Sequence, residues 1–142
     1  MTSDKYRQTE RVLYDYKFIK GYVELRKQDL QELEYEGVKA LQYSETMSGS
    51  GEISDPVARE FEIIEKQRFL LKKAIAEKEL IIKKIDYALH ILSDLERNIV
   101  EMKYFKGIRN YDIADCLGYS KKQIERINKS TIYNISSMIW ID

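Results

Sequence analysis

The chain has 142 residues, enough for one or two small domains, and its 24 Lys and Arg balance its 24 Asp and Glu. Without net charge, no global electrostatic field can drive nucleic-acid binding, so any such binding must come from a local basic patch. A single cysteine excludes an internal disulfide framework. No apolar run is long enough to span a bilayer, and the N-terminus lacks the apolar core of a signal peptide. We therefore expect a cytoplasmic protein with no membrane partner.

Residues 5 to 43 are predicted to form one long amphipathic helix. They contain no proline, and apolar side chains recur at alternating three- and four-residue spacing, interrupted at Arg26: Tyr16, Ile19, Val23, Leu30 and Leu33. Gly21 and Gly37 are the positions where this helix could break or bend. The segment is rich in tyrosine, which favours packing at a helix seam over stacking on nucleic-acid bases.

Residues 44 to 56, SETMSGSGEISDP, are predicted to form a linker between two helices. Ser, Gly and Asp cluster there, and Pro56 suits the first turn of a following helix with Ser54 or Asp55 as its N-cap. The length of this linker suits a reversal of chain direction.

Residues 57 to 92 carry the most regular pattern in the chain, a four-three alternation typical of the coiled-coil heptad. The positions are Val57, Phe61, Ile64, Arg68, Leu71, Ile75, Lys78, Ile82, Ile85, Leu89 and Leu92. Such a helix cannot bury its seam alone. We favour an antiparallel hairpin with residues 5 to 43, and a homodimer stays compatible because Ala74, Ile81 and Ala88 widen the stripe.

Ser93 and Asp94 end the periodic run, so we place a domain boundary between residues 1 to 92 and residues 93 to 142. Three shorter helices are predicted in the second part: Leu95 to Phe105, Asn110 to Leu117, and one that starts at Ser120. Gly107 is expected to stop the first, Asn110 to cap the second, and Ser120 with Gln123 to form a capping box on the third. That helix is expected to continue past Ser130, with its apolar end packed on the hairpin or on a partner.

The second and third of these helices have the pattern of a helix-turn-helix motif. Ala114 is small enough for the two axes to approach, Gly118 can adopt the left-handed conformation of a tight turn, and Ile124 can fill the corner. Cys116, beside Leu117, is expected to pack in the core rather than to react. In such motifs the second helix enters the DNA major groove with its first turns against the bases.

The exposed side chains of that helix suit the chemistry of DNA. Lys and Arg can donate to guanine O6 and N7, Gln can pair with adenine, and Glu can accept from cytosine N4. We predict base contacts from Lys121, Lys122, Gln123, Glu125 and Arg126. Candidate phosphate contacts are Arg109, Tyr111, Asn128 and Lys129. The alternative is a small helical packing module whose basic face is simply solvated.

The run LSDLERNIVEMKYFKGIRNYDIADCLGYSKKQIERI resembles the fourth domain of bacterial sigma factors, through its Ile113-Ala114 pair, its Leu-Gly-Tyr-Ser turn and Ile124 four residues beyond Ser120. The order of parts in the whole chain resembles the RinA/ArpU group of phage and prophage late-gene transcriptional regulators. The resemblance is strongest over residues 93 to 132. It implies double-stranded promoter DNA as a partner, activation of late genes, a possible contact with RNA polymerase, and a place in the cytoplasm of a bacterial host.

Other function classes are compatible with parts of the pattern. A small terminase subunit for phage DNA packaging also combines a helix-turn-helix with oligomerising helices. A third possibility is an interaction scaffold whose helix-turn-helix binds protein and not DNA. An enzyme is not expected, because the carboxylates are spread along helix faces at salt-bridge spacing. With one histidine and one cysteine, we expect neither a metal site nor a cofactor.

Overall fold

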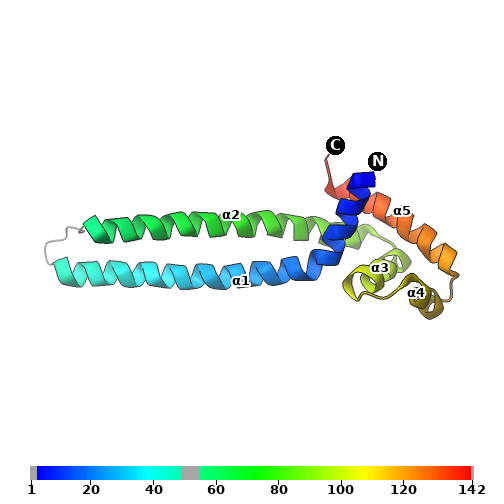
Figure 1. Cartoon of the computed structure of the whole chain (residues 1–142), viewed down its shortest axis with the longest axis horizontal. Helices are drawn as coiled ribbons and strands as arrows, with labels where there is room; N and C mark the ends of the chain where they lie inside the picture. Colours follow the sequence, from blue (N-terminus) through cyan, green and yellow to red (C-terminus); the bar gives the residue numbers. More distant parts are fainter. Residues whose placement is uncertain (1–2, 49–54, 142) are drawn as a thin grey trace. The chain divides into compact units, whose positions relative to one another are not determined.

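The computed structural model describes residues 3–48 and 55–141, and over these residues the protein is all-α, as predicted, with no strand. Its helices are α1 (Ser3–Ser48), α2 (Asp55–Ile91), α3 (Asp94–Val100), α4 (Asn110–Leu117) and α5 (Lys121–Ile139) (Figure 1). A π-helical turn, η1 (Glu101–Phe105), continues directly from α3. None of the described helices is both long and apolar enough to cross a membrane.

The helix α1 is longer than predicted, and neither glycine within it interrupts it. Gly37 is buried, and a Cβ at that position would lie 3.5 Å from a side-chain methyl of Ile64 in α2, which is an ordinary van der Waals contact. Pro56 lies in the first turn of α2, as expected, because that turn needs no backbone N–H from it. The start of the predicted linker is wrong, because residues 44–48 belong to α1, and Asp55 already belongs to α2. The remaining linker residues 49–54, including the cap position Ser54, lie outside the described residues.

Contacts divide the chain into two compact units that do not follow the boundary predicted after residue 92. One unit is Gly21–Glu79, and the other combines Met1–Lys20 with Leu80–Asp142. The difference arises because the first turns of α1 and the last turns of α2 bury their apolar side chains in the same core as the C-terminal helices. Both long helices therefore contribute to both units.

In the unit Gly21–Glu79, α1 and α2 lie side by side and run in opposite directions (Figure 1). The periodic positions fill the space between them, with Val23, Leu33, Ile64 and Ile75 buried. Two ion pairs cross from one helix to the other, Lys27 to Glu79 at 2.8 Å and Arg68 to Glu34 at 3.1 Å. All four side chains remain partly exposed to solvent, so the apolar stripe rather than the ion pairs holds the two helices together.

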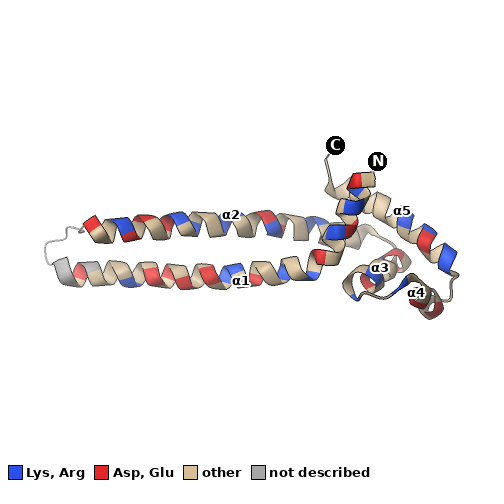
Figure 2. Ribbon diagram, viewed as in Figure 1, with Lys and Arg blue, Asp and Glu red and all other residues tan. Residues whose placement is uncertain are grey.

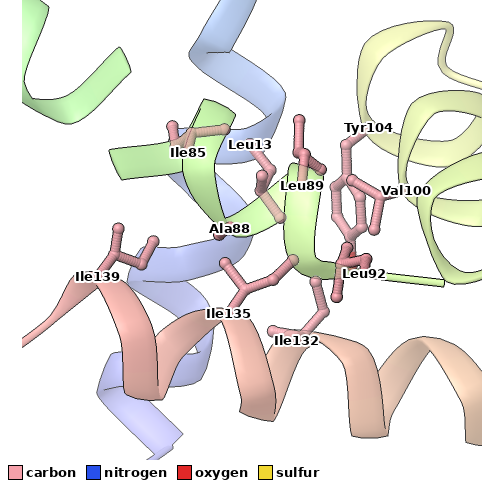
Figure 3. Packing of buried hydrophobic residues seen from close by; sticks show 10 residues of the cluster. All are labelled: Leu13, Ile85, Ala88, Leu89, Leu92, Val100, Tyr104, Ile132, Ile135 and Ile139. Carbon is pink, nitrogen blue, oxygen red and sulfur yellow. The ribbon is translucent and has the colours of Figure 1, made fainter. Parts of the chain in front are cut away.

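In the other unit, α1, α2, η1 and α5 share one hydrophobic core with α3 (Figure 3). Its buried members are Leu13, Ile85, Ala88, Leu89, Leu92, Val100, Tyr104, Ile132, Ile135 and Ile139. The apolar end of α5 thus packs on the first turns of α1 and the last turns of α2. Trp140, just past α5, donates its indole N–H to the hydroxyl of the buried Thr9 at 2.9 Å. This core fixes α5 from one side and leaves its other side open.

Candidate nucleic-acid interface

The connection between α4 and α5 is a tight turn built by backbone and cap interactions. Gly118 has φ 76°, the left-handed conformation that glycine adopts without a steric penalty. The amides of Gly118 and Tyr119 both donate to the carbonyl of Ala114, at 2.9 and 3.0 Å. The hydroxyl of Ser120 accepts from the amide of Gln123, whose side chain accepts from the amide of Ser120, so the predicted capping box is present. These bonds fix the direction in which α5 leaves the turn.

A second small core holds α3, α4 and α5 together next to this turn. Ile99, Ile113 and Ile124 are fully buried, and Ala114 is 4% exposed. Ala114 has no side chain beyond Cβ, so α4 can lie close against α5 where Ile124 packs. The predicted roles of Ala114 and Ile124 in packing agree with this arrangement. The orientation of α5 is therefore set at both ends, by this core and by the larger one around Ile135.

The start of α4 differs from the prediction, because Arg109 rather than Asn110 is its N-cap residue. The cap makes no side-chain hydrogen bond, and Asn110 is already helical. The side-chain Oδ1 of Asn110 is buried and has no hydrogen-bond partner among the described residues. The side chain of Arg109 is 83% exposed and its Nε lies 3.2 Å from a carboxylate oxygen of Asp112. An exposed pair of this kind holds Arg109 only weakly.

Basic residues occupy the N-terminal half of α5, while residues 131 to 139 carry no charge (Figure 2). The side chains of Lys122, Arg126 and Lys129 are exposed. The Nζ of Lys121 lies 3.7 Å from a carboxylate oxygen of Glu125, and the two side chains are about half exposed (60% and 48%). The surface of the first three turns of α5 is thus positively charged overall, with one of its four cations paired to the single carboxylate.

The predicted surface position of Asn128 is wrong. Its side chain is 3% exposed and its amide Nδ2 donates to the hydroxyl of Tyr104 at 2.9 Å. That hydroxyl donates in turn to Glu10 of α1 at 2.8 Å. Burial, and less strongly the neighbouring Glu10, raises the pKa of Tyr104 far above its usual value, although the Asn128 bond acts in the opposite direction. The phenol therefore stays protonated as a donor, and Asn128 is held inside the protein.

A groove with a volume of about 730 Å³ lies beside the start of α5. It brings together three basic side chains from separate elements, Lys103 of η1, Arg109 and Lys121. Two tyrosines also line it, Tyr111, which is 62% exposed, and Tyr14 of α1. Burial, together with the charge of Glu10, raises the pKa of Tyr14, so its hydroxyl remains neutral. Such a groove offers cationic and hydroxyl donors to an anion.

The structure thus brings Arg109, Tyr111, Lys121 and Glu125 together at one groove, and leaves Lys122, Gln123, Arg126 and Lys129 on the adjoining face of α5. The side-chain oxygen of Gln123 is engaged in the capping box. The predicted burial of Cys116 is also wrong, since it is exposed. Sequence reasoning missed Lys103, although it lies close to Lys106 and Arg109 in the chain, and missed Tyr14, which only tertiary packing places here.

No family model, no curated protein and no solved structure matches this chain.

Proposed function

We propose that this protein is a sequence-specific regulator of transcription that binds double-stranded DNA. In this proposal α4, the turn at Gly118 and α5 form a sigma-domain-4-like helix-turn-helix carried on an antiparallel helical hairpin. The observation that carries it is the division of α5 into an uncharged C-terminal half, whose apolar side is buried in the larger core, and an N-terminal half with an exposed basic face that begins at a capped tight turn. A helix of that kind presents cations on one exposed face and has a width that the major groove accepts.

The base-reading set follows from exposure along the first turns of α5. Lys122 and Arg126 are exposed and one turn apart, so both can reach base edges, with guanine as the preferred partner. Lys121, Gln123 and Glu125 flank them. Gln123 keeps its amide N–H₂ as a donor while its oxygen serves the cap.

Phosphate contacts come from the residues that surround this row. Arg109, Tyr111 and Lys129 are exposed on its flanks and can fix the register of the protein on the duplex. Asn128 is not part of the proposed interface, because it is buried against Tyr104. By resemblance to the RinA/ArpU group, the bound sites are promoters of phage late genes, the output is activation, and RNA polymerase is a second partner.

The test is footprinting of the full-length protein across the DNA that surrounds its own gene, with the mass of the assembly recorded. We expect a monomer or dimer to protect a discrete site close to a promoter. Arg126→Ala and Lys122→Ala should each weaken binding to that site by about 1 to 3 kcal/mol if the side chain contacts a base. Arg59→Ala and Lys72→Ala, which alter exposed basic residues of α2, serve as matched controls and should bind normally.

Each possible result separates the candidate functions. Protection of a packaging site by a large ring of subunits would replace this proposal with a terminase function, and absence of protection anywhere would leave a protein-binding scaffold. Unchanged affinity in both α5 variants would show that α5 is not the reader. Ala114→Phe should prevent the close approach of α4 and α5 and abolish binding. A folded, fully active Ala114→Phe protein would refute the motif itself.

A further inference from the structure

The first turns of α1 lie beside the exposed face of α5, more than 110 residues away in the sequence. The rings of Tyr6 and Tyr133 are 5.6 Å apart between their centroids. A recess of about 270 Å³ is lined from α1 by Ser3, Tyr6, Arg7 and Glu10, and from α5 by Lys129 and Tyr133. Arg7 and Lys129 thus face the same recess from two different helices. Both side chains are exposed.

Arg7 extends a row of cations that runs along α5. Lys122, Arg126, Lys129 and Tyr133 are separated by four, three and four residues, so at 3.6 residues per turn they fall within a sector of roughly 60° on the helix surface. The row is about 16 Å long at 1.5 Å per residue. The recess joins its far end to Arg7, so four positive charges follow one another from the reading end of α5 onto α1.

The single carboxylate that lines the recess, Glu10, is outnumbered there by the cations of Arg7 and Lys129. One of its oxygens accepts from the hydroxyl of Tyr104 at 2.8 Å, and Glu10 is only partly exposed. The next recess along α1 is lined by Asp4, Arg7, Gln8 and Arg11. Beside Arg7 it therefore adds one exposed cation, Arg11, and one carboxylate, Asp4. The charge at this end of α5 remains net positive.

We propose that Arg7 is a phosphate-binding residue that holds one phosphodiester of the duplex, while Lys129 holds a neighbouring one. This inference rests on the proposed DNA-binding function and adds to it a contact supplied by the other end of the chain. A guanidinium presents a planar fork that matches two phosphate oxygens, and a lysine adds a point charge beside it. Such a contact positions the protein on the backbone and carries no sequence information.

The experiment measures the affinity of the full-length protein for its protected site, and for an unrelated duplex of equal length, over a series of salt concentrations. Losing one phosphate contact should reduce the slope of log K against log salt by about 0.9. Between 1 M and 0.1 M salt, a slope of about 0.9 changes the binding constant by a factor of 10 to the power 0.9. Losing the contact should therefore weaken binding roughly eightfold at 0.1 M salt. Arg7→Ala should show this loss equally on both duplexes, whereas Arg126→Ala should lose affinity mainly for the protected site.

Matched variants separate a lost contact from a disturbed fold. Arg7 is exposed on a helix, so an alanine there should keep the helix intact. Trp140 is hydrogen-bonded to Thr9, two residues after Arg7, so its fluorescence reports any local change. Arg7→Gln gives a second neutral variant that retains the side-chain stem. Arg7→Lys should keep the wild-type salt slope while losing part of the affinity, since it keeps the charge but not the fork. Arg59→Ala on α2 controls for removing an exposed arginine elsewhere.

The outcomes for the two proposals are distinct. If the wild type protects a site and Arg126→Ala weakens it, but both neutral Arg7 variants bind with the slope of Arg59→Ala, the phosphate contact is overturned while the reading function of α5 stands. If the wild-type protein binds neither duplex even at low salt, both proposals fall.

Discussion

Replacing Tyr104 with phenylalanine removes a single hydroxyl that connects three helical elements. Tyr104 belongs to η1 and is 3% exposed; its hydroxyl donates to Glu10 of α1 and accepts from Asn128 of α5. The ring itself packs in the large core, so the substitution leaves the apolar contacts in place and deletes only the two hydrogen bonds (Figure 3).

The cost follows from what each partner loses. Asn128 is buried, and its Oδ1 already has no hydrogen-bond partner among the described residues. Tyr104→Phe would also leave Nδ2 without its acceptor, which costs about 1 to 3 kcal/mol of stability. Glu10 is half-buried and can take up water, so its lost bond costs about 0.5 to 1.5 kcal/mol. We therefore expect Tyr104→Phe to lower the free energy of unfolding by about 3 kcal/mol.

Urea unfolding followed by tryptophan fluorescence measures this cost. Trp140 is the single tryptophan and is bonded to Thr9, so it reports on the unit that contains Tyr104. With urea slopes of about 1 to 3 kcal/mol per molar, the midpoint should fall by about 1 to 3 M. The control is Tyr87→Phe: Tyr87 is 66% exposed, so removing its hydroxyl should leave the midpoint unchanged.

A double substitution tests the mechanism as well as the magnitude. Asn128→Leu removes the amide that Tyr104→Phe would leave unpaired, so adding it to Tyr104→Phe should recover part of the lost stability. The same Asn128→Leu change in the wild type corrects for the better helix propensity of leucine. Equal midpoints for Tyr104→Phe and Tyr87→Phe would refute the reasoning, since the buried hydrogen bonds would then contribute nothing to folding.

Three further predictions concern local features. Gly118→Ala should cost about 1 to 2 kcal/mol, since φ is 76° there, and a lower urea midpoint would show it. Ser120→Ala should cost about 1 kcal/mol by the same measurement, because the capping box is lost. Burial raises the pKa of Glu96, but hydrogen bonds from Ser93 and Thr131 outweigh it, so the folded pKa lies below the usual value of 4.5. Its stabilisation is complete above pH 4.5 and disappears as the pH falls through the folded pKa, so Glu96→Gln should flatten the acid side of a pH–stability curve.

Features that depend on a few neighbouring residues were predictable from the sequence. Ser120 with Gln123 and the left-handed Gly118 need only the local chain, and they are present as expected. The predicted heptad positions from Val57 to Leu92, all but the last of them in α2, are buried or half-buried except Lys78, because period alone decides which side of a helix meets a partner. The all-α class follows from the same periodicity.

Errors arose where residue type was given more weight than position. Asn128 lies four residues after Ile124 and four before Ile132, both fully buried, so the helical period places it inward although its amide suggests the surface. Cys116 is the reverse case. Cysteine is among the residue types most often buried, yet Cys116 is exposed. The reason is its position, about 110° around the helix from the centre of the inward face of α4 defined by Ile113, Ala114 and Leu117.

Contacts between distant parts of the chain could not be predicted from local pattern. Arg97 of α3 donates to the backbone carbonyls of Leu89 at 2.9 Å and Leu92 at 2.9 Å, and so satisfies the C-terminal end of α2. Nothing in the sequence around Arg97 distinguishes it from a solvated helix arginine. The same holds for Arg7 and Tyr14, whose places beside α5 depend on the packing of α1 in the shared core.

The shared core has a direct consequence for the boundary after residue 92 that the sequence suggested. Ile132, Ile135 and Ile139 are at most 4% exposed because α1 and the last turns of α2 cover them. A fragment of residues 93 to 142 would expose all three side chains. Each fully buried isoleucine contributes about 1.5 to 3 kcal/mol, so the three together contribute about 4.5 to 9 kcal/mol, which approaches the whole stability of a small domain. We therefore expect this fragment to lack a cooperative thermal transition by circular dichroism. Adding residues 1 to 20 as a separate peptide should not fully restore it, because Ile85 and Leu89 would still be missing. A fragment that unfolds cooperatively on its own would show that the smaller core around Ile99 suffices, and that the position of α5 does not depend on α1.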